Sequence, residues 1–196
     1  DIRNITQIEK ICTQEKPNII LNCAAYTDVE SAEDIWKKEC FDTNTLWVYN
    51  LAKITDTLDI DLIIFSSDYV FDGISDVPLS EDTQPNPQNN YGMSKYLAEE
   101  ITRIENPDSI IVRTSWLYGW GKGFHNFVNT MIALSETQTE LSLVDDQYGS
   151  PTYAIDLVHA LSQLIEKIEE ERWNVFHLSG NTPWYGVSWY EFAAEI

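Results

Sequence analysis

Tyr91 and Lys95 stand four residues apart in the stretch "NNYGMSKYLAEE". On a helix, this spacing places both side chains on one face. An isolated tyrosine titrates at about pH 10 and is a sluggish acid at neutral pH, whereas a neighbouring ammonium favours the phenolate and lowers the pKa of the tyrosine. Such a pair can pass a proton to a carbonyl oxygen while a hydride reaches the carbonyl carbon.

Two other tyrosine–lysine pairs share this spacing, Tyr49/Lys53 and Tyr118/Lys122. The second pair spans two glycines in an expected loop, so no helix brings its side chains together. Tyr49 lies well inside an expected helix whose other face is apolar, and we interpret it as a packing residue. The spacing alone therefore does not single out Tyr91 and Lys95.

The surroundings of Tyr91 do distinguish it. The loop "TQPNPQNN" precedes it, and it begins a helix expected over about 92–105. That helix follows the strand "DLIIFSS" through a loop that begins at Asp68. Ligands of open α/β sheets bind beyond the carboxyl ends of the strands. Ser67 ends that strand, and its hydroxyl can bind a substrate oxygen there.

The elements that must position these residues follow from the apolar pattern. Short continuous apolar runs alternate with longer helical segments, which is typical of a parallel sheet covered on both faces. We expect strands in "NIILNCAA", "DLIIFSS", "SIIVRTSWLY" and "VFHLSG". We expect helices near 34–58, 92–105, 124–134 and 154–171, a first helix with Thr6 and Glu9 in a capping box, and a last helix capped by Ser188 and Glu191.

The fold class is therefore α/β, a doubly wound, Rossmann-like parallel sheet with a small C-terminal substrate-binding lobe. We expect residues 1–118 and about 152–178 to form a shortened NAD(P)-binding domain. Residues of about 119–151 and 179–196 would form part of the lobe, and "LSLVDDQYGSPTY" in it should be a short strand followed by a turn.

Composition narrows the class of partners. The net charge is −20, from 32 acidic and 12 basic residues, which argues against nucleic acids and anionic membranes as partners. No apolar run approaches the roughly 18 residues of a membrane helix. The three cysteines lack a C-x-x-C motif, which favours reduced thiols in the cytoplasm over disulfides, and with three scattered histidines they predict no metal site.

Several motifs, taken in order, resemble the extended short-chain dehydrogenase/reductase family, and within it the dTDP-4-dehydrorhamnose reductases. They are "NCAAYTDVESAE", "SSDYVFDG", "YGMSK", "RTSWLYG", "VDDQYGSPTYAIDL" and "SWYEFA". The resemblance implies reduction of the C4 ketone of a dTDP-4-dehydro-6-deoxy-sugar by NADPH or NADH. It also makes Mg²⁺ a candidate cofactor of the full-length protein and a homodimer the candidate assembly.

The resemblance assigns roles to individual residues. Tyr91 would be the proton donor, Lys95 its pKa-lowering partner and the anchor of the nicotinamide ribose, and Ser67 the group that binds the substrate oxygen. Further cofactor contacts would come from Asp1, Ile2, Ala25, Tyr26 and Thr27, and sugar contacts from Val29 and Trp116. For Val29 and Trp116, core packing is the alternative interpretation.

Two features depart from related enzymes. Nucleotide-sugar 4,6-dehydratases have a second acid after the aspartate that corresponds to Asp68, whereas this chain has Tyr69, which disfavours dehydration. The first glycine is Gly73, so the Gly-rich phosphate turn of the family has no counterpart before it, and we expect about forty N-terminal residues and a stretch after Ile196 to be absent.

Two alternatives stay open. One is a non-catalytic regulatory subunit of the same fold, similar to the β subunit of methionine adenosyltransferase. The other is an epimerase or a reductase of another nucleotide sugar, because the contacts that select the sugar cannot be placed from this pattern.

Overall fold

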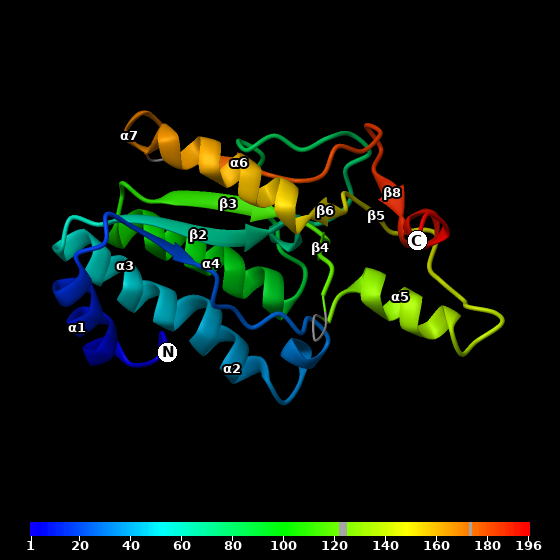
Figure 1. Ribbon diagram of the computed structural model, residues 1–196, viewed down its shortest axis with the longest axis horizontal. Helices are drawn as coiled ribbons and strands as arrows, with labels where there is room; N and C mark the ends of the chain where they lie inside the picture. The colour runs from blue at the N-terminus through cyan, green and yellow to red at the C-terminus, as the bar shows by residue number, and fades with distance from the viewer. Residues whose placement is uncertain (122–124, 173) are drawn as a thin grey trace. The chain divides into compact units, whose positions relative to one another are not determined.

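The computed structural model describes residues 1–121, 125–172 and 174–196 (Figure 1). It has two compact units. The first contains Asp1–Ile74, Ser80–Arg113 and Ile168–His177, and the second contains Ser75–Leu79, Thr114–Lys167 and Leu178–Ile196. Residues 75–79, 114–118, 152–167 and 178, which we expected in the NAD(P)-binding domain, belong to the second unit. The assignment of a cofactor domain and a substrate lobe stays a prediction.

The first unit is built on a four-stranded sheet with the order β1-β2-β3-β7. The strands are β1 (Ile19–Asn22), β2 (Asp61–Ser67), β3 (Ile110–Thr114) and β7 (Val175–His177). β1 pairs with β2 and β3 with β7, both in parallel. This parallel central sheet confirms the predicted α/β class.

The helical segments of this unit lie before and between its strands in sequence. They are α1 (Ile5–Glu15), η1 (Ser31–Glu33), α2 (Lys37–Phe41), η2 (Asp42–Leu46), α3 (Trp47–Thr57), η3 (Asp68–Val70), α4 (Asn90–Glu105) and α7 (Ile168–Glu171). Figure 1 shows α3 and α4 on the same side of β2. Long helices thus alternate with strands, as the apolar pattern predicts.

The core explains why β2 is apolar along its whole length. Leu62 and Ile64 of β2 pack against Leu51 of α3 and Ala98 of α4. Ile63 points to the opposite face, and its exposed fraction is 0%. Because successive side chains of a strand alternate between the faces, burial on both faces requires apolar residues at successive positions.

The helix expected over 34–58 is not continuous. A π-helical stretch, η2, separates α2 from α3 and buries Asn44 and Thr45. π-helical turns of this kind insert an extra residue into a helix and redirect its side chains.

The start of α1 also differs from the prediction. The Asn4 side chain caps this helix by accepting a hydrogen bond from the Gln7 N–H at 3.0 Å. The expected capping box of Thr6 and Glu9 was therefore wrong.

Two other elements expected to be continuous are divided. The strand expected over 109–118 breaks after Thr114, because Trp116 takes a left-handed backbone conformation with φ of 45°. The chain resumes as β4 (Leu117–Tyr118). The helix expected over 154–171 is divided at Lys167 into α6 (Ala154–Glu166) and α7.

The second unit contains two small strand pairs and three helices among its described residues. β4 pairs in parallel with β6 (Thr152–Tyr153), and β5 (Tyr148–Gly149) pairs antiparallel with β8 (Val187–Ser188). The helices are α5 (Phe127–Ser135), α6 and α8 (Trp189–Ala194). The strand expected from residue 141 begins only at Tyr148. The predicted capping box of Ser188 and Glu191 at α8 is confirmed.

A buried ion pair joins α4 to β3. Arg113 donates to both carboxylate oxygens of Glu99, from Nε at 2.9 Å and from Nη2 at 2.6 Å. The side chains are 3% and 0% exposed. Such a pair contributes little net stability over apolar packing, but loss of one partner leaves a buried charge without compensation.

A close backbone approach fixes the N-terminal end of α4. A Cβ atom added to Gly92 would lie 2.1 Å from the carbonyl oxygen of Tyr69, far inside van der Waals contact. The Asn89 side chain caps the helix by accepting from the Gly92 N–H at 2.7 Å. Glycine is therefore required in the first turn of α4 for the helix to reach η3.

The ion pair generates the first prediction. Arg113→Met should lower the free energy of unfolding by about 3–5 kcal/mol, because the Glu99 carboxylate would stay buried without a partner. Arg103→Met is the control, since Arg103 pairs with Glu100 at 3.0 Å on the surface, and it should cost less than about 1 kcal/mol. Urea denaturation of both variants gives the comparison. Equal losses would show that the buried pair is not needed.

The close approach generates the second prediction. Gly92→Ala should cost about 1–3 kcal/mol of unfolding free energy, although alanine favours helices, because the helix must move away from Tyr69. Gly119→Ala is the matched control, since among the described residues its added Cβ would meet only the Ala154 Cβ, at 3.5 Å, and we expect a change within about 0.5 kcal/mol. A Gly92→Ala variant as stable as the parent in urea would contradict this account of α4.

Candidate active site

The first turns of α4 bring Tyr91 and Lys95 to the carboxyl end of β2. Asn89 has an extended backbone and caps the helix, so the chain enters α4 directly from the preceding loop. Tyr91 is 9% exposed and Lys95 is 6% exposed. Both side chains lie on one helical face, as their spacing predicts.

Ser67 completes this group from the end of β2. Its hydroxyl donates to Asp68 Oδ1 at 3.0 Å and accepts from the Tyr69 N–H at 3.2 Å. A hydrogen bond of its side chain with Tyr91 lowers the pKa of the phenol. The structure therefore brings Ser67 and Tyr91 together, although they are distant in sequence.

Lys95 ties the helix to the strand. Its Nζ donates to the carbonyl oxygen of Phe65 at 3.1 Å and lies 5.9 Å from the centroid of the Tyr91 ring. A lysine ammonium has three donors. Donors beyond the bond to Phe65 suit the hydroxyl groups of a sugar ligand, so the donor chemistry fits the ribose that the motif resemblance implies.

The pKa of Tyr91 is shifted in the direction opposite to the one we expected from the neighbouring Lys95. Burial raises the pKa of Tyr91 to about 12, more than the hydrogen bond with Ser67 lowers it. Burial also lowers the pKa of Lys95 to about 8. The expected lowering of the Tyr91 pKa was therefore wrong, because desolvation of the charged form outweighs the neighbouring groups. Tyr91 stays a neutral phenol at neutral pH, which is the form that can donate a proton.

Asn44 holds the turn after β1 against α4. Its Oδ1 accepts from the Tyr26 N–H at 2.8 Å, and its Nδ2 donates to the Tyr26 carbonyl at 3.0 Å. The same Nδ2 lies 2.9 Å from the Ser94 hydroxyl of α4. These bonds fix the predicted cofactor turn Ala25–Thr27 through its backbone, and they do not involve the side chains of the turn.

Side chains in this turn and just after it pack close to Tyr91. Tyr26 and Val29 pack against the cluster formed by Ala32, Cys40 and Tyr91. Of the predicted ligand contacts, Tyr26 and Val29 therefore lie beside the proposed proton donor. Their roles toward cofactor and sugar stay predictions.

The sequence pattern did not lead us to Asn44. It occupies a helix face with Val48 and Leu51, at positions i, i+4 and i+7, where an apolar residue would ordinarily stand. A polar residue on an otherwise apolar helix face could have indicated this role, because a buried polar side chain needs hydrogen-bond partners.

The contacts described above do not include Asp1, Ile2 or Trp116. Asp1 precedes α1 and pairs with Arg3 at 2.6 Å. Trp116 belongs to the second unit, where its ring stacks on Trp189 with a centroid distance of 3.4 Å and an interplanar angle of 6°. That geometry matches the packing interpretation of Trp116, while its role toward a sugar stays a prediction.

The other two tyrosine–lysine pairs have different settings. Lys53 Nζ donates to the Tyr49 hydroxyl at 3.3 Å on the exposed face of α3. The pair is in direct contact, yet it sits within a surface helix rather than at a strand end. Lys122 lies outside the described residues, so the Tyr118/Lys122 pair is not placed.

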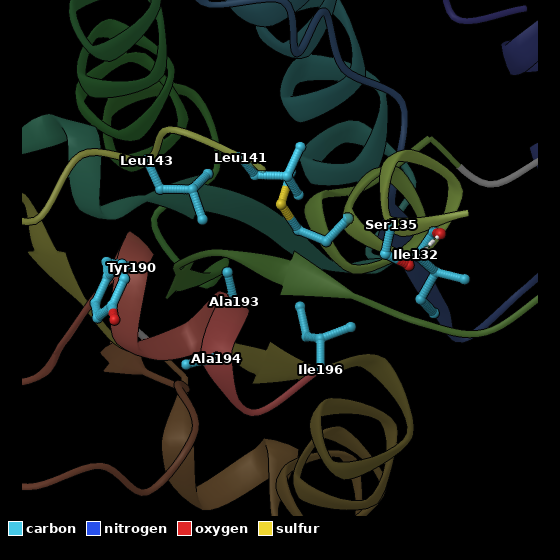
Figure 2. A pocket seen from close by; sticks show the side chains of 9 residues that line it. Ile132, Ser135, Leu141, Leu143, Tyr190, Ala193, Ala194 and Ile196 are labelled. Atoms are coloured by element: carbon cyan, nitrogen blue, oxygen red, sulfur yellow. Dashed lines mark hydrogen bonds between the residues drawn. The ribbon is translucent and has the colours of Figure 1, made fainter. Parts of the chain in front are cut away.

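A pocket of about 220 Å³ lies within the second unit (Figure 2). It is formed by α5, α8 and the segment between them, and its lining is mostly apolar: Met131, Ile132, Ser135, Leu141, Leu143, Tyr190, Ala193, Ala194 and Ile196.

Within the described parts of the chain, no group of three or more His, Cys, Asp or Glu side chains is arranged to hold a metal ion. No helix of those parts is long and apolar enough to cross a membrane.

Two proteins are similar to this chain in sequence. A dTDP-4-dehydrorhamnose reductase from Aggregatibacter actinomycetemcomitans is 37% identical over 200 residues, covering 100% of this chain and 66% of the relative. The spore coat polysaccharide biosynthesis protein SpsK of Bacillus subtilis is 40% identical over 182 residues, covering 92% of this chain and 60% of the relative.

A crystal structure of dTDP-4-dehydrorhamnose reductase from Bacillus anthracis in complex with NADP superimposes with a TM-score of 0.92 at 38% identity. The superposition covers 66% of the length of that enzyme and 100% of this chain. The chain thus spans about two thirds or less of the length of these relatives. The family model described as the RmlD substrate binding domain matches residues 1–196. On this match, and on the motifs that surround Ser67, Tyr91 and Lys95, the chain belongs to the RmlD substrate binding domain family.

Proposed function

We propose that the complete gene product containing this chain reduces the C4 ketone of a dTDP-4-dehydro-6-deoxy-sugar, with dTDP-4-dehydrorhamnose as the first substrate to test. The observation that carries the proposal is the group of Ser67, Tyr91 and Lys95 at the carboxyl end of β2. The similarity to reductases of this name supports the substrate class. The NADP complex of the Bacillus anthracis enzyme makes NADPH the first cofactor to test.

Part of the cofactor would be held by residues of this chain. Lys95 would bind the nicotinamide ribose, and the turn Ala25–Thr27 would lie along the cofactor. When bound, the nicotinamide supplies the hydride for the carbonyl carbon. The first glycine of the chain is Gly73, so residues 1–72 contain no Gly-rich turn for the pyrophosphate.

The proton chemistry follows from the states of the side chains. Tyr91 is a neutral phenol at neutral pH and would donate its proton to the ketone oxygen. The Ser67 hydroxyl would bind the same oxygen, where negative charge develops during the transfer. The Lys95 ammonium, protonated below a pKa of about 8, would stabilise the phenolate that remains on Tyr91.

Dehydration fits this site less well than reduction. Tyr69 follows Asp68 and packs edge-on against Tyr91, with ring centroids 5.6 Å apart. An aromatic ring at this position cannot act as the carboxylate base that removes a proton in a 4,6-dehydratase. The site therefore favours simple ketone reduction.

The third prediction tests the proton donor. Tyr91→Phe in the complete gene product should lower turnover by about 10²–10⁴-fold, because it removes the acid while keeping the ring. Oxidation of NADPH, followed at the nicotinamide absorbance band with the dTDP-4-keto sugar as substrate, measures it. Tyr49→Phe is the matched control and should stay within a few-fold of the parent, because its hydroxyl contacts only Lys53 among the bonds described.

Other outcomes separate the alternatives. A parent protein that binds NADPH but turns over no ketone sugar would contradict the reductase and favour a regulatory subunit. A Tyr91→Phe variant with parental turnover would contradict Tyr91 as the donor. Turnover of a UDP-sugar in preference to the dTDP-sugar would assign another nucleotide-sugar substrate.

A further inference from the structure

The Ser67 hydroxyl has one proton, and an ionised Asp68 carboxylate beside it can only accept that proton in a hydrogen bond. It is donated to Asp68 Oδ1 at 3.0 Å, while the Tyr69 N–H occupies one acceptor site of the same oxygen at 3.2 Å. A serine hydroxyl has a single donor and two acceptor sites. While Asp68 is a carboxylate, the bond to it takes the single Ser67 proton, and the neutral phenol of Tyr91 is then the donor in the hydrogen bond between Tyr91 and Ser67. Ser67 then has no second proton to offer to a ketone oxygen.

We propose that Asp68 is a positioning residue that sets the direction of the Ser67 hydroxyl, and that its protonated form is the one that supports ketone reduction. A protonated Asp68 carboxyl donates to Ser67 Oγ. The serine proton is then released toward the substrate oxygen. This inference rests on the proposed function and adds to it the residue that controls Ser67.

The surroundings of Asp68 allow it to change its charge under mild conditions. Asp68 is partly buried, and burial raises its pKa to about 6, more than the hydrogen bonds from Ser67 and the backbone lower it. The negative charge of Asp68 raises the pKa values of Tyr69 in η3 and Tyr91 on α4. Further titratable groups around these two tyrosines are Lys95 on α4, Cys40 on α2 and Glu30 before η1.

The charge of Asp68 also acts on the proton donor directly. The negative charge of Asp68 raises the pKa of Tyr91 and so makes it a weaker acid. Protonation of Asp68 removes that charge. The two effects have the same sign, because a neutral Asp68 frees the Ser67 proton and makes Tyr91 the better donor.

Protons and electrons balance in the proposed reduction. The hydride carries its electron pair from the reduced nicotinamide to the carbonyl carbon, and the Tyr91 phenol proton goes to the carbonyl oxygen, which becomes a hydroxyl. The Tyr91 phenolate then takes the Ser67 proton, and Ser67 takes the Asp68 proton. Asp68 is left as a carboxylate and regains its proton from water.

The kinetic test compares Asp68→Asn with the parent over a range of pH in the complete gene product. For the parent, kcat/KM should fall by about 10-fold or more as the pH rises through the pKa of Asp68, since a donor to the developing oxyanion is lost. The side-chain amide of the Asp68→Asn variant donates at every pH, so this fall should be absent from it. Asp68→Ala should be slow at every pH, because an alanine side chain has no donor.

Asp82→Asn is the matched control, since Asp82 is an exposed aspartate in the loop before α4. It should keep the parental fall of kcat/KM with pH. If Asp68→Asn also keeps that fall, Asp68 does not set the direction of Ser67 and the inference is wrong. If the parent reduces no keto sugar at any pH, the proposed function fails instead.

A second measurement needs neither substrate nor cofactor. Carbon-13 NMR of the aspartate carboxyls, with the Asp68 signal assigned by its loss in Asp68→Asn, should show a midpoint at about pH 6. Ser67→Ala should raise that midpoint, because the serine hydrogen bond stabilises the carboxylate. A midpoint at the ordinary aspartate value of 3.8, unchanged by Ser67→Ala, would overturn the inference independently of any activity.

Discussion

The position of α4 depends on one buried charge. The Arg113 guanidinium is 3% exposed and meets Glu99, one turn beyond Lys95 on the helix. Arg113 also donates to the Glu81 carbonyl at 3.3 Å and lies 3.3 Å from His177 Nε2. A buried charge cannot lose its partner cheaply. β3, β7 and the loop before α4 are therefore held in one arrangement around the helix that carries the candidate site.

Two short contacts at the start of α4 complete this constraint. Gly92 lets the helix approach the backbone of Tyr69, and Lys95 donates to the Phe65 carbonyl. The first contact limits the distance between α4 and η3, and the second limits the rotation of the helix about its axis. With Glu99 held by Arg113 in the middle of the helix, Tyr91 has little freedom to leave Ser67. Preorganisation of this kind is what proton transfer to a bound ketone requires.

Prediction succeeded where the deciding information is local. Tyr91 and Lys95 share a face because helical geometry follows from spacing, and the burial of Ile63 follows from an uninterrupted apolar strand. The direction of the Tyr91 pKa was predicted wrongly, because it depends on how much water remains around the phenol. Asn44 was missed for a related reason, since its partner Tyr26 is 18 residues away in sequence.

The sequence by itself determined the alternation of strands and helices, the tyrosine and lysine of α4, and the motifs that mark the family. Those features repeat with the periods of the strand and the helix, so neighbouring residues suffice to produce them. Only the tertiary structure decided that Ser67 meets Tyr91 and that Asn44 holds the turn after β1 in place. Hydrogen-bond partners and desolvation arise from chain segments that meet in space, and no local pattern records which segments will meet.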